Sequence, residues 1–182
     1  MTDAAIDKHL LRTWIELDRA ALAHNLGLFR GLLPAGCRLM AVAKSNAYGH
    51  GLYDFVPAVD RLGADWLGVD SIVEAATLRE MGIEKPILVL GYTLPARFEE
   101  AVRLRTSLTV SSFESLAALG RSGVGDKVQV HIKIDTGLHR QGFLPTQVLE
   151  LIAVLRRDHH GLGVEGLYTH FAAAKDPDDT AY

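Results

Sequence analysis

The sequence is poor in the features that mark secreted, membrane-spanning and nucleic-acid-binding proteins. Its single cysteine, Cys37, cannot form an internal disulfide, so we expect a reduced, semi-buried side chain. No run of about 18 apolar residues occurs, which predicts no transmembrane helix. A formal net charge of -3 without a Lys/Arg run gives no electrostatic case for nucleic acid. The opening MTDAAIDKHLLRTW lacks the continuous apolar stretch of a secretory signal, and we therefore expect a cytoplasmic location.

What is present is an alternation of short apolar, β-branched runs with longer segments of helical period. The predicted strands are 38–43, 66–69, 87–90, 108–110, 128–134 and 164–169. The predicted helices are 18–33, 52–62, 72–81, 95–104, 113–119 and 145–157. Gly63, Gly82 and Gly120 follow predicted helix ends, where a left-handed residue favours glycine. A further short strand is expected at 13–17, outside this rhythm.

Strands followed repeatedly by helices predict an α/β fold built on a parallel sheet. Runs such as LMAVA and ILVL are apolar at every position, as expected for strands covered on both faces. No G-x-G-x-x-G follows the first strand, which disfavours a dinucleotide-binding fold. The pattern leaves two architectures open. One is an incomplete (β/α)8 TIM-like barrel with about six of eight parallel strands and an extra N-terminal strand, and the other is a complete six-stranded open sheet.

Titratable residues follow the predicted strands directly. Lys44, Asp70 and Asp135 each come at a strand end, Arg140 lies in the loop beyond Asp135, and His170 closes the last strand. Parallel α/β folds place their chemistry at the carboxyl ends of the strands. We therefore expect these groups to converge at one edge of the sheet.

The segment AVAKSNAYGHG, residues 41–51, carries the strongest local pattern. A neutral amine on Lys44 could form a Schiff base with an aldehyde cofactor. The Tyr48 hydroxyl could donate to an anion, and Gly49 and Gly51 let the backbone bend closely around a bound group. The alternative is a solvated lysine in a glycine-bearing turn beside a partly buried tyrosine. His50 is expected to be a hydrogen-bonding residue that structures the loop.

This undecapeptide resembles the pyridoxal-phosphate (PLP) attachment signature of alanine racemases. TWIELDRAALAHNL resembles that family's opening strand and first helix, KIDTGLHRQGF (133–143) its second block, and EGLYTHFAAA (165–174) its third. The blocks occur in the family's order and cover essentially the whole chain. The resemblance implies an extension and strand over 1–17, a partial PLP-binding barrel over 18–182, and a C-terminal β domain that is absent from this sequence.

The resemblance also implies roles for single residues. Lys44 would hold PLP as a Schiff base and act as acid and base on one face of the substrate. Tyr48 would donate a hydrogen bond to the cofactor phosphate. Arg140 would lie near the phenolic oxygen and the substrate carboxylate, and His170 would pack against the pyridine ring.

Lys133 matches a lysine that is carbamylated in a number of family members. Lys133 lies in a strand between two isoleucines, where an unmodified ammonium would be costly unless it is paired. The alternatives are a snorkelling lysine or an ion pair with Asp135. His131 is expected to be a structural strand residue, and no metal site is expected.

The activity implied is interconversion of L- and D-alanine by removal of the Cα proton and its return on the opposite face, supplying D-alanine for peptidoglycan. The resemblance implies a homodimer in which a tyrosine of the missing domain supplies the second base. We expect this chain alone to show little activity and to self-associate through an open barrel edge. The alternatives are a racemase for serine, lysine or several amino acids, a PLP-binding regulatory barrel protein, and a non-catalytic structural fragment.

Overall fold

The computed structural model describes residues 8–174, 176 and 178. Residues 1–7 of the expected extension, together with 175, 177 and 179–182 of the expected barrel, lie outside the described residues. The strands are β1 (Met40–Val42), β2 (Trp66–Val69), β3 (Ile87–Val89), β4 (Ser107–Val110), β5 (Gln129–Lys133) and β6 (Gly163–Tyr168). The α elements are α1 (Arg19–Leu32), α2 (Lys44–Tyr48), α3 (Leu52–Arg61), α4 (Ile72–Glu80), α5 (Phe98–Arg103), α6 (Phe113–Arg121) and α7 (Val148–Asp158). Short 3₁₀ turns are η1 (Lys8–Leu10), η2 (Pro95–Arg97), η3 (Gly125–Lys127) and η4 (Pro145–Gln147).

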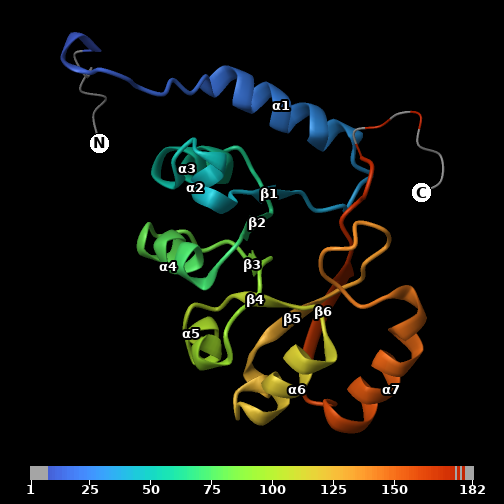
Figure 1. Ribbon diagram of the computed structural model, residues 1–182. Helices are drawn as coiled ribbons and strands as arrows, with labels where there is room; N and C mark the ends of the chain where they lie inside the picture. The colour runs from blue at the N-terminus through green and yellow to red at the C-terminus, as the bar shows by residue number, and fades with distance from the viewer. Residues whose placement is uncertain (1–7, 175, 177, 179–182) are drawn as a thin grey trace.

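The six strands form one parallel sheet in the order β1-β2-β3-β4-β5-β6, which is also their order along the chain. This confirms the predicted α/β alternation and all six parallel strands. In Figure 1 the helices α3 to α7 lie along one face of the curved sheet. Sequential order with helices on one face is the arrangement of a (β/α)8 barrel, whereas a doubly wound sheet carries helices on both faces. The sheet is open, with β1 and β6 at its two edges.

The face of the sheet that the helices cover holds most of the hydrophobic core. Leu67, Val69, Leu108, Val130 and Ile132 are buried, and all belong to one cluster with side chains of the covering helices. Complete burial of an aliphatic side chain of this size contributes about 1.5–3 kcal/mol. The apolar strand positions thus fix which side of the sheet the helices occupy.

The opposite face of β4, β5 and β6 is polar. The Ser107 hydroxyl donates to the Glu165 carboxylate at 2.5 Å, and the Thr109 and Tyr168 hydroxyls are 3.0 Å apart. The His131 ring lies edge-on to Trp66, with 5.4 Å between ring centroids. An irregularity in the β5–β6 pairing at His131 interrupts the even register there. Partnered polar groups of this kind specify the inner face of a barrel rather than a second apolar layer.

Two expectations about the N-terminal part of the chain are wrong. Residues 13–17 belong to no strand of the described sheet; they line a groove together with residues of α1 and α3. A short β-prone segment needs a neighbouring strand edge to form a strand. Cys37 is exposed rather than semi-buried, because it lies in the turn between α1 and β1, outside the core.

The glycines after the predicted helices serve two different purposes. Gly63 (φ 91°) and Gly82 (φ 79°) adopt the expected left-handed conformation just beyond α3 and α4. The same expectation is wrong for Gly120, because α6 continues past it to Arg121. A Cβ atom at Gly120 would come within 2.5 Å of the His159 ring. Gly120 therefore permits α6 to approach the end of α7.

No helix among the described residues is long and apolar enough to cross a membrane.

Candidate functional site

The carboxyl ends of the strands bring four cationic or basic side chains together. Lys44 follows β1, Lys133 ends β5, Arg140 lies in the next loop, and His170 follows β6. The positive charges of Lys44 and Arg140 lower the pKa of both Lys133 and His170, although burial is the largest cause of each shift. Lys44, Lys133, Arg140 and His170 thus share one electrostatic environment. Tyr48 does not take part in it.

Lys133 is the buried member of this group, with 5% of its surface exposed. Its Nζ lies 5.7 Å from the centroid of the Tyr168 ring. Burial, followed by the charge of Arg140, lowers the pKa of Lys133, and the carboxylate of Asp135 opposes this shift. The neutral amine is therefore more accessible at Lys133 than at a solvated lysine.

The Asp135 carboxylate accepts hydrogen bonds from the loop that follows it. One carboxylate oxygen accepts hydrogen bonds from the backbone amides of Gly137 and His139, each at 3.0 Å. These bonds are the main reason why the pKa of Asp135 lies below its ordinary value. Asp135 thereby fixes the loop that carries Arg140.

The same loop returns to the sheet through a close backbone contact. Phe143 donates its amide to the Lys133 carbonyl and accepts from the Asp135 amide, at 2.9 and 2.8 Å. Gly142 has a φ of 138°, and a Cβ atom there would lie 2.6 Å from the Asp135 nitrogen. Arg140 is exposed, and its backbone is held between two anchored points of the loop.

Lys44 opens an unusual turn. Ser45, Asn46, Ala47 and Tyr48 all have φ angles of 54–55°, so α2 is a single left-handed turn built without glycine. L-residues in this conformation cost roughly 1–2 kcal/mol each. Surrounding contacts must offset that cost, because four such residues follow one another.

Several contacts hold this turn. Ala47 is buried in the core, and its carbonyl lies 2.7 Å from His50 Nδ1. The Asn46 side-chain oxygen accepts from the Leu52 amide at 2.9 Å, which joins the turn to α3. The expected role of His50 as a loop-structuring hydrogen bonder is confirmed. Tyr48 ends the turn with 60% of its surface exposed.

Sequence reasoning missed Glu74. One oxygen of its carboxylate accepts from the Asn46 amide at 3.2 Å and the other from the Asp70 amide at 2.8 Å. The available pattern was Ser71-x-x-Glu74, which is typical of a helix N-cap and gives no indication of a contact with a distant turn. Asp70 itself is exposed and contributes its backbone rather than its carboxylate.

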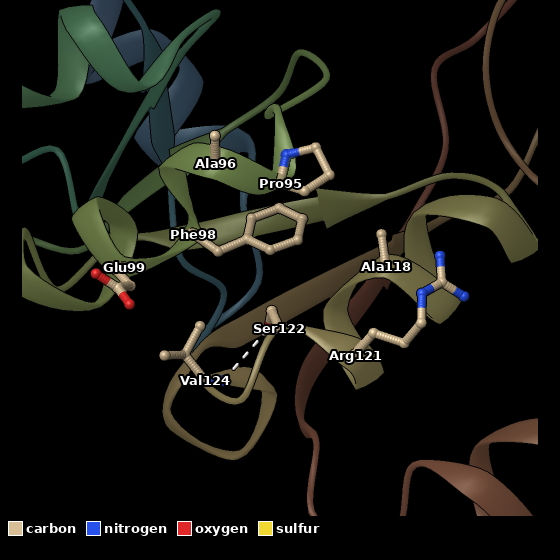
Figure 2. Close-up of a pocket in the computed structure, with 8 residues that line it drawn as sticks. All are labelled: Pro95, Ala96, Phe98, Glu99, Ala118, Arg121, Ser122 and Val124. Carbon is tan, nitrogen blue, oxygen red and sulfur yellow. Dashed lines mark hydrogen bonds between the residues drawn. The ribbon is translucent and has the colours of Figure 1, made fainter.

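Two hollows of the surface lie away from the four basic groups. A cavity of about 460 Å³ lies between α5 and α6, where Phe98 projects into it while the charged ends of Glu99 and Arg121 point outward (Figure 2). A wider groove of about 1030 Å³ borders α1 and α3 and reaches Asn46 and His50 on the left-handed turn. Lys44 lines neither of these two hollows.

The group at the strand ends suits an anionic cofactor with an electrophilic carbon. Lys44 supplies an amine, and Lys133, Arg140 and His170 supply positive charge or hydrogen-bond donors for phosphate, phenolate or carboxylate oxygens. These donors fit PLP, which carries an aldehyde and a phosphate. The described residues hold no group of three or more His, Cys, Asp or Glu side chains arranged for a metal ion.

Known proteins resemble this chain in sequence and in fold. The family model described as "Alanine racemase, N-terminal domain" matches residues 17–182. An alanine racemase of Symbiobacterium thermophilum is 42% identical over 167 residues, which are 91% of this chain and 44% of that relative. A Bacillus anthracis alanine racemase solved with bound L-Ala-P is 33% identical over 91% of this chain and 43% of its own, with a TM-score of 0.83. A histidine racemase of Leuconostoc mesenteroides is 31% identical over 88% of this chain and 43% of its own, with a TM-score of 0.76. This chain therefore spans less than half the length of these proteins.

Proposed function

The chain belongs to the alanine racemase family through its N-terminal domain, and on that premise we propose that it is the cofactor-binding part of a PLP-dependent racemase that interconverts L- and D-alanine. The observation that carries the proposal is the position of Lys44. Its amine lies at the end of β1, close enough to Lys133 and His170 to lower the pKa of both. A primary amine beside several cations suits attachment of an anionic aldehyde.

Lys44 would hold PLP through its amine and, once substrate is bound, accept or return a proton at one face of the substrate Cα. Tyr48 would donate its hydroxyl to the phosphate; its exposure leaves that hydroxyl available to a ligand. When bound, PLP supplies an electron sink for the negative charge left on Cα. The side chains of this domain supply orientation and electrostatic stabilisation.

Arg140 would bind the substrate carboxylate and the phenolic oxygen of the cofactor. A guanidinium suits both because it stays charged and presents paired donors. His170 would flank the ring; burial, followed by the charge of Arg140, lowers its pKa, which disfavours a further positive charge in the group. The anchored loop around Asp135 supports this arrangement by limiting the movement of Arg140.

We propose carbamylation of Lys133 as part of the same site. In this reaction the neutral Nζ attacks CO2, a C–N bond forms, and one proton leaves to solvent. Burial favours the neutral amine that the reaction needs, and the charge of Arg140 stabilises the resulting carbamate. Intact mass of the protein at neutral pH and after acidification tests this directly, because acid releases CO2.

We propose that the protein works as a homodimer, and that this domain by itself associates through the edges of its sheet. In support, β6 is an edge strand on which Val164 and Leu167 are 47% and 65% exposed. An apolar strand edge of this kind favours pairing with another chain. Light scattering of this domain at high concentration tests its self-association, which a uniform monomer would contradict. Light scattering of the protein that carries this domain tests the homodimer, and a monomer there would contradict that proposal.

The decisive experiment uses the whole protein that carries this domain: it reduces the PLP-loaded protein with borohydride and maps the pyridoxyl adduct, alongside an assay of D-alanine formed from L-alanine. We expect the adduct on Lys44 and complete loss of adduct and activity in Lys44→Ala. Lys127→Ala is the matched control, because Lys127 is exposed at the opposite end of β5. An adduct elsewhere, or none, would refute the proposal.

A panel of other amino acids separates the alternatives. The similarity to a histidine racemase favours one specific rival, a racemase of this family with another substrate. Racemisation of histidine, serine or lysine faster than alanine would assign that function instead. PLP binding without racemisation of any amino acid would favour a regulatory barrel protein, and absence of both a structural role.

A further inference from the structure

The side chain of Glu74 connects two loops at the carboxyl ends of neighbouring strands. It belongs to α4, which follows β2, yet one of its oxygens accepts the amide of Asn46 in the left-handed turn after β1. The other oxygen accepts the amide of Asp70 at the end of β2 itself. One carboxylate thus ties the Lys44 turn to the adjacent strand.

This use of Glu74 departs from its usual local role. Ser71 is the N-cap of α4, and its hydroxyl accepts the Glu74 amide at 3.3 Å, as in one half of a capping box. In the other half the glutamate would accept the amide of Ser71. Glu74 instead accepts the amide one residue earlier, at Asp70, and extends across to Asn46. Its carboxylate therefore bridges the two loops instead of capping α4.

Glu74 contacts Asn46, a residue of the turn that is held by several hydrogen bonds. Asn46 is the second of four left-handed residues, and three of its groups are fixed at once. Its amide donates to Glu74, its side chain accepts from Leu52, and its carbonyl accepts from Gly51 at 3.0 Å. Of these three partners of Asn46, Gly51 and Leu52 follow it closely in sequence, whereas Glu74 belongs to α4.

We propose that Glu74 is a positioning residue for Lys44: it acts through the backbone amide of Asn46 and holds the left-handed turn, so that the lysine amine stays beside Lys133, Arg140 and His170. This inference rests on the proposed function, because it assigns Glu74 a role in cofactor attachment. A carboxylate suits the role because it offers two acceptors and no donor, and it meets two backbone donors.

The test compares Glu74→Gln with Glu80→Gln in the purified protein that carries this domain. Glutamine keeps the size of Glu74 but presents an NH2 group to one of the two amides. Glu80 is exposed in the last turn of the same helix, so it is a matched control. We expect Glu74→Gln to weaken PLP binding about tenfold and to speed amide exchange in residues 44–51 by at least about tenfold, as for loss of a charged hydrogen bond. The control variant should change neither quantity.

A second variant guards against misfolding of the first. Glu74→Asp keeps the charge and the N-terminal position in α4, but it is one methylene too short to reach both loops. We expect the same faster exchange in residues 44–51 and the same loss of PLP affinity, with the unfolding temperature within a few degrees of wild type.

The outcomes separate this inference from the proposed function. If wild type forms the Lys44 adduct while both Glu74 variants bind PLP normally and keep slow exchange in 44–51, only the positioning role is overturned. Faster exchange spread evenly over the whole chain would also overturn it, since that result indicates general destabilisation. If wild type forms no adduct on Lys44, the proposed function and this inference both fail.

Discussion

Replacement of Gly142 by alanine tests how tightly the Arg140 loop is packed against the sheet. At a φ of 138°, the added Cβ would lie 2.6 Å from the Asp135 nitrogen, 2.9 Å from the Ile134 carbonyl carbon and 3.1 Å from the Lys133 carbonyl oxygen. Those are backbone atoms, and two of them hydrogen-bond to Phe143, at 2.8 and 2.9 Å. They cannot move aside without breaking the contact that returns the loop to β5.

The magnitude follows from two costs. The backbone conformation costs roughly 1–3 kcal/mol for a residue with a Cβ, and steric crowding adds about 1–3 kcal/mol. We therefore expect Gly142→Ala to lower the free energy of unfolding by about 2–6 kcal/mol. Gly123→Ala isolates the first cost, because Gly123 has a φ of 73° and nothing within 4 Å of the added Cβ. Gly27→Ala, inside α1 with open space around it, should stabilise the protein by about 1 kcal/mol.

Urea denaturation of the three variants beside wild type measures the order directly. The expected order of stability is Gly27→Ala, wild type, Gly123→Ala, Gly142→Ala, with an unchanged slope. Because the loop carries Arg140, Gly142→Ala should also weaken PLP binding, while Gly123→Ala should not. Equal destabilisation by Gly123→Ala and Gly142→Ala would refute the packing argument.

Three shorter predictions concern charge and packing. Burial is the largest cause of the lowered pKa of His170 and the charge of Arg140 the second, so Arg140→Gln should raise that pKa part of the way toward 6.5, as followed by NMR titration of the ring; no change would mean that Arg140 does not act on His170. Leu78→Ala should cost about 2–5 kcal/mol by thermal or urea unfolding, because Leu78 is completely buried in α4, and a cost below about 1 kcal/mol would contradict that burial. Asp65 has a lowered pKa first because it accepts a hydrogen bond from the Leu39 amide at 2.7 Å, and second because of its contact with Arg30 at 2.6 Å; the side chains of Asp65 and Arg30 are both more than one-third exposed. Asp65→Asn should therefore cost only about 0.5–1 kcal/mol above pH 4, a cost that shrinks as the pH falls through the lowered pKa of Asp65, and a pH-independent cost would refute the linkage.

The strands and their parallel pairing were predictable because the controlling force is local. ILVL and LMAVA are apolar at every position, so each must be covered on both sides, and the helices between them leave parallel pairing as the simple solution. The convergence of Lys44, Arg140 and His170 follows from that geometry alone. Residues 13–17 failed the same reasoning, since strand formation needs a neighbouring edge and the sequence does not specify one.

The details of the site were harder to predict from the sequence, because they depend on tertiary contacts. Nothing local predicts a left-handed turn over residues 45–48, because none of its four residues is glycine and each disfavours that conformation. Local contacts of Asn46 and Ala47 with Leu52 and His50 hold the turn, together with one contact from a residue distant in sequence, Glu74. Gly120 illustrates a different limit of sequence reasoning. A glycine after an apolar helical pattern predicts a helix end, but here the glycine lies within α6 and leaves room for the His159 side chain.

The left-handed conformation of the turn after Lys44 affects how far this segment can move. Each of the four residues carries a Cβ and must cross a sterically unfavourable region to pass from positive to negative φ, which opposes unwinding of the turn. The segment behaves as one stiff block, and bending is concentrated at Gly49 and Gly51, which tolerate both signs of φ. A cofactor held by Lys44, as proposed above, would then meet the rigid turn on its lysine side and the two glycines beyond it.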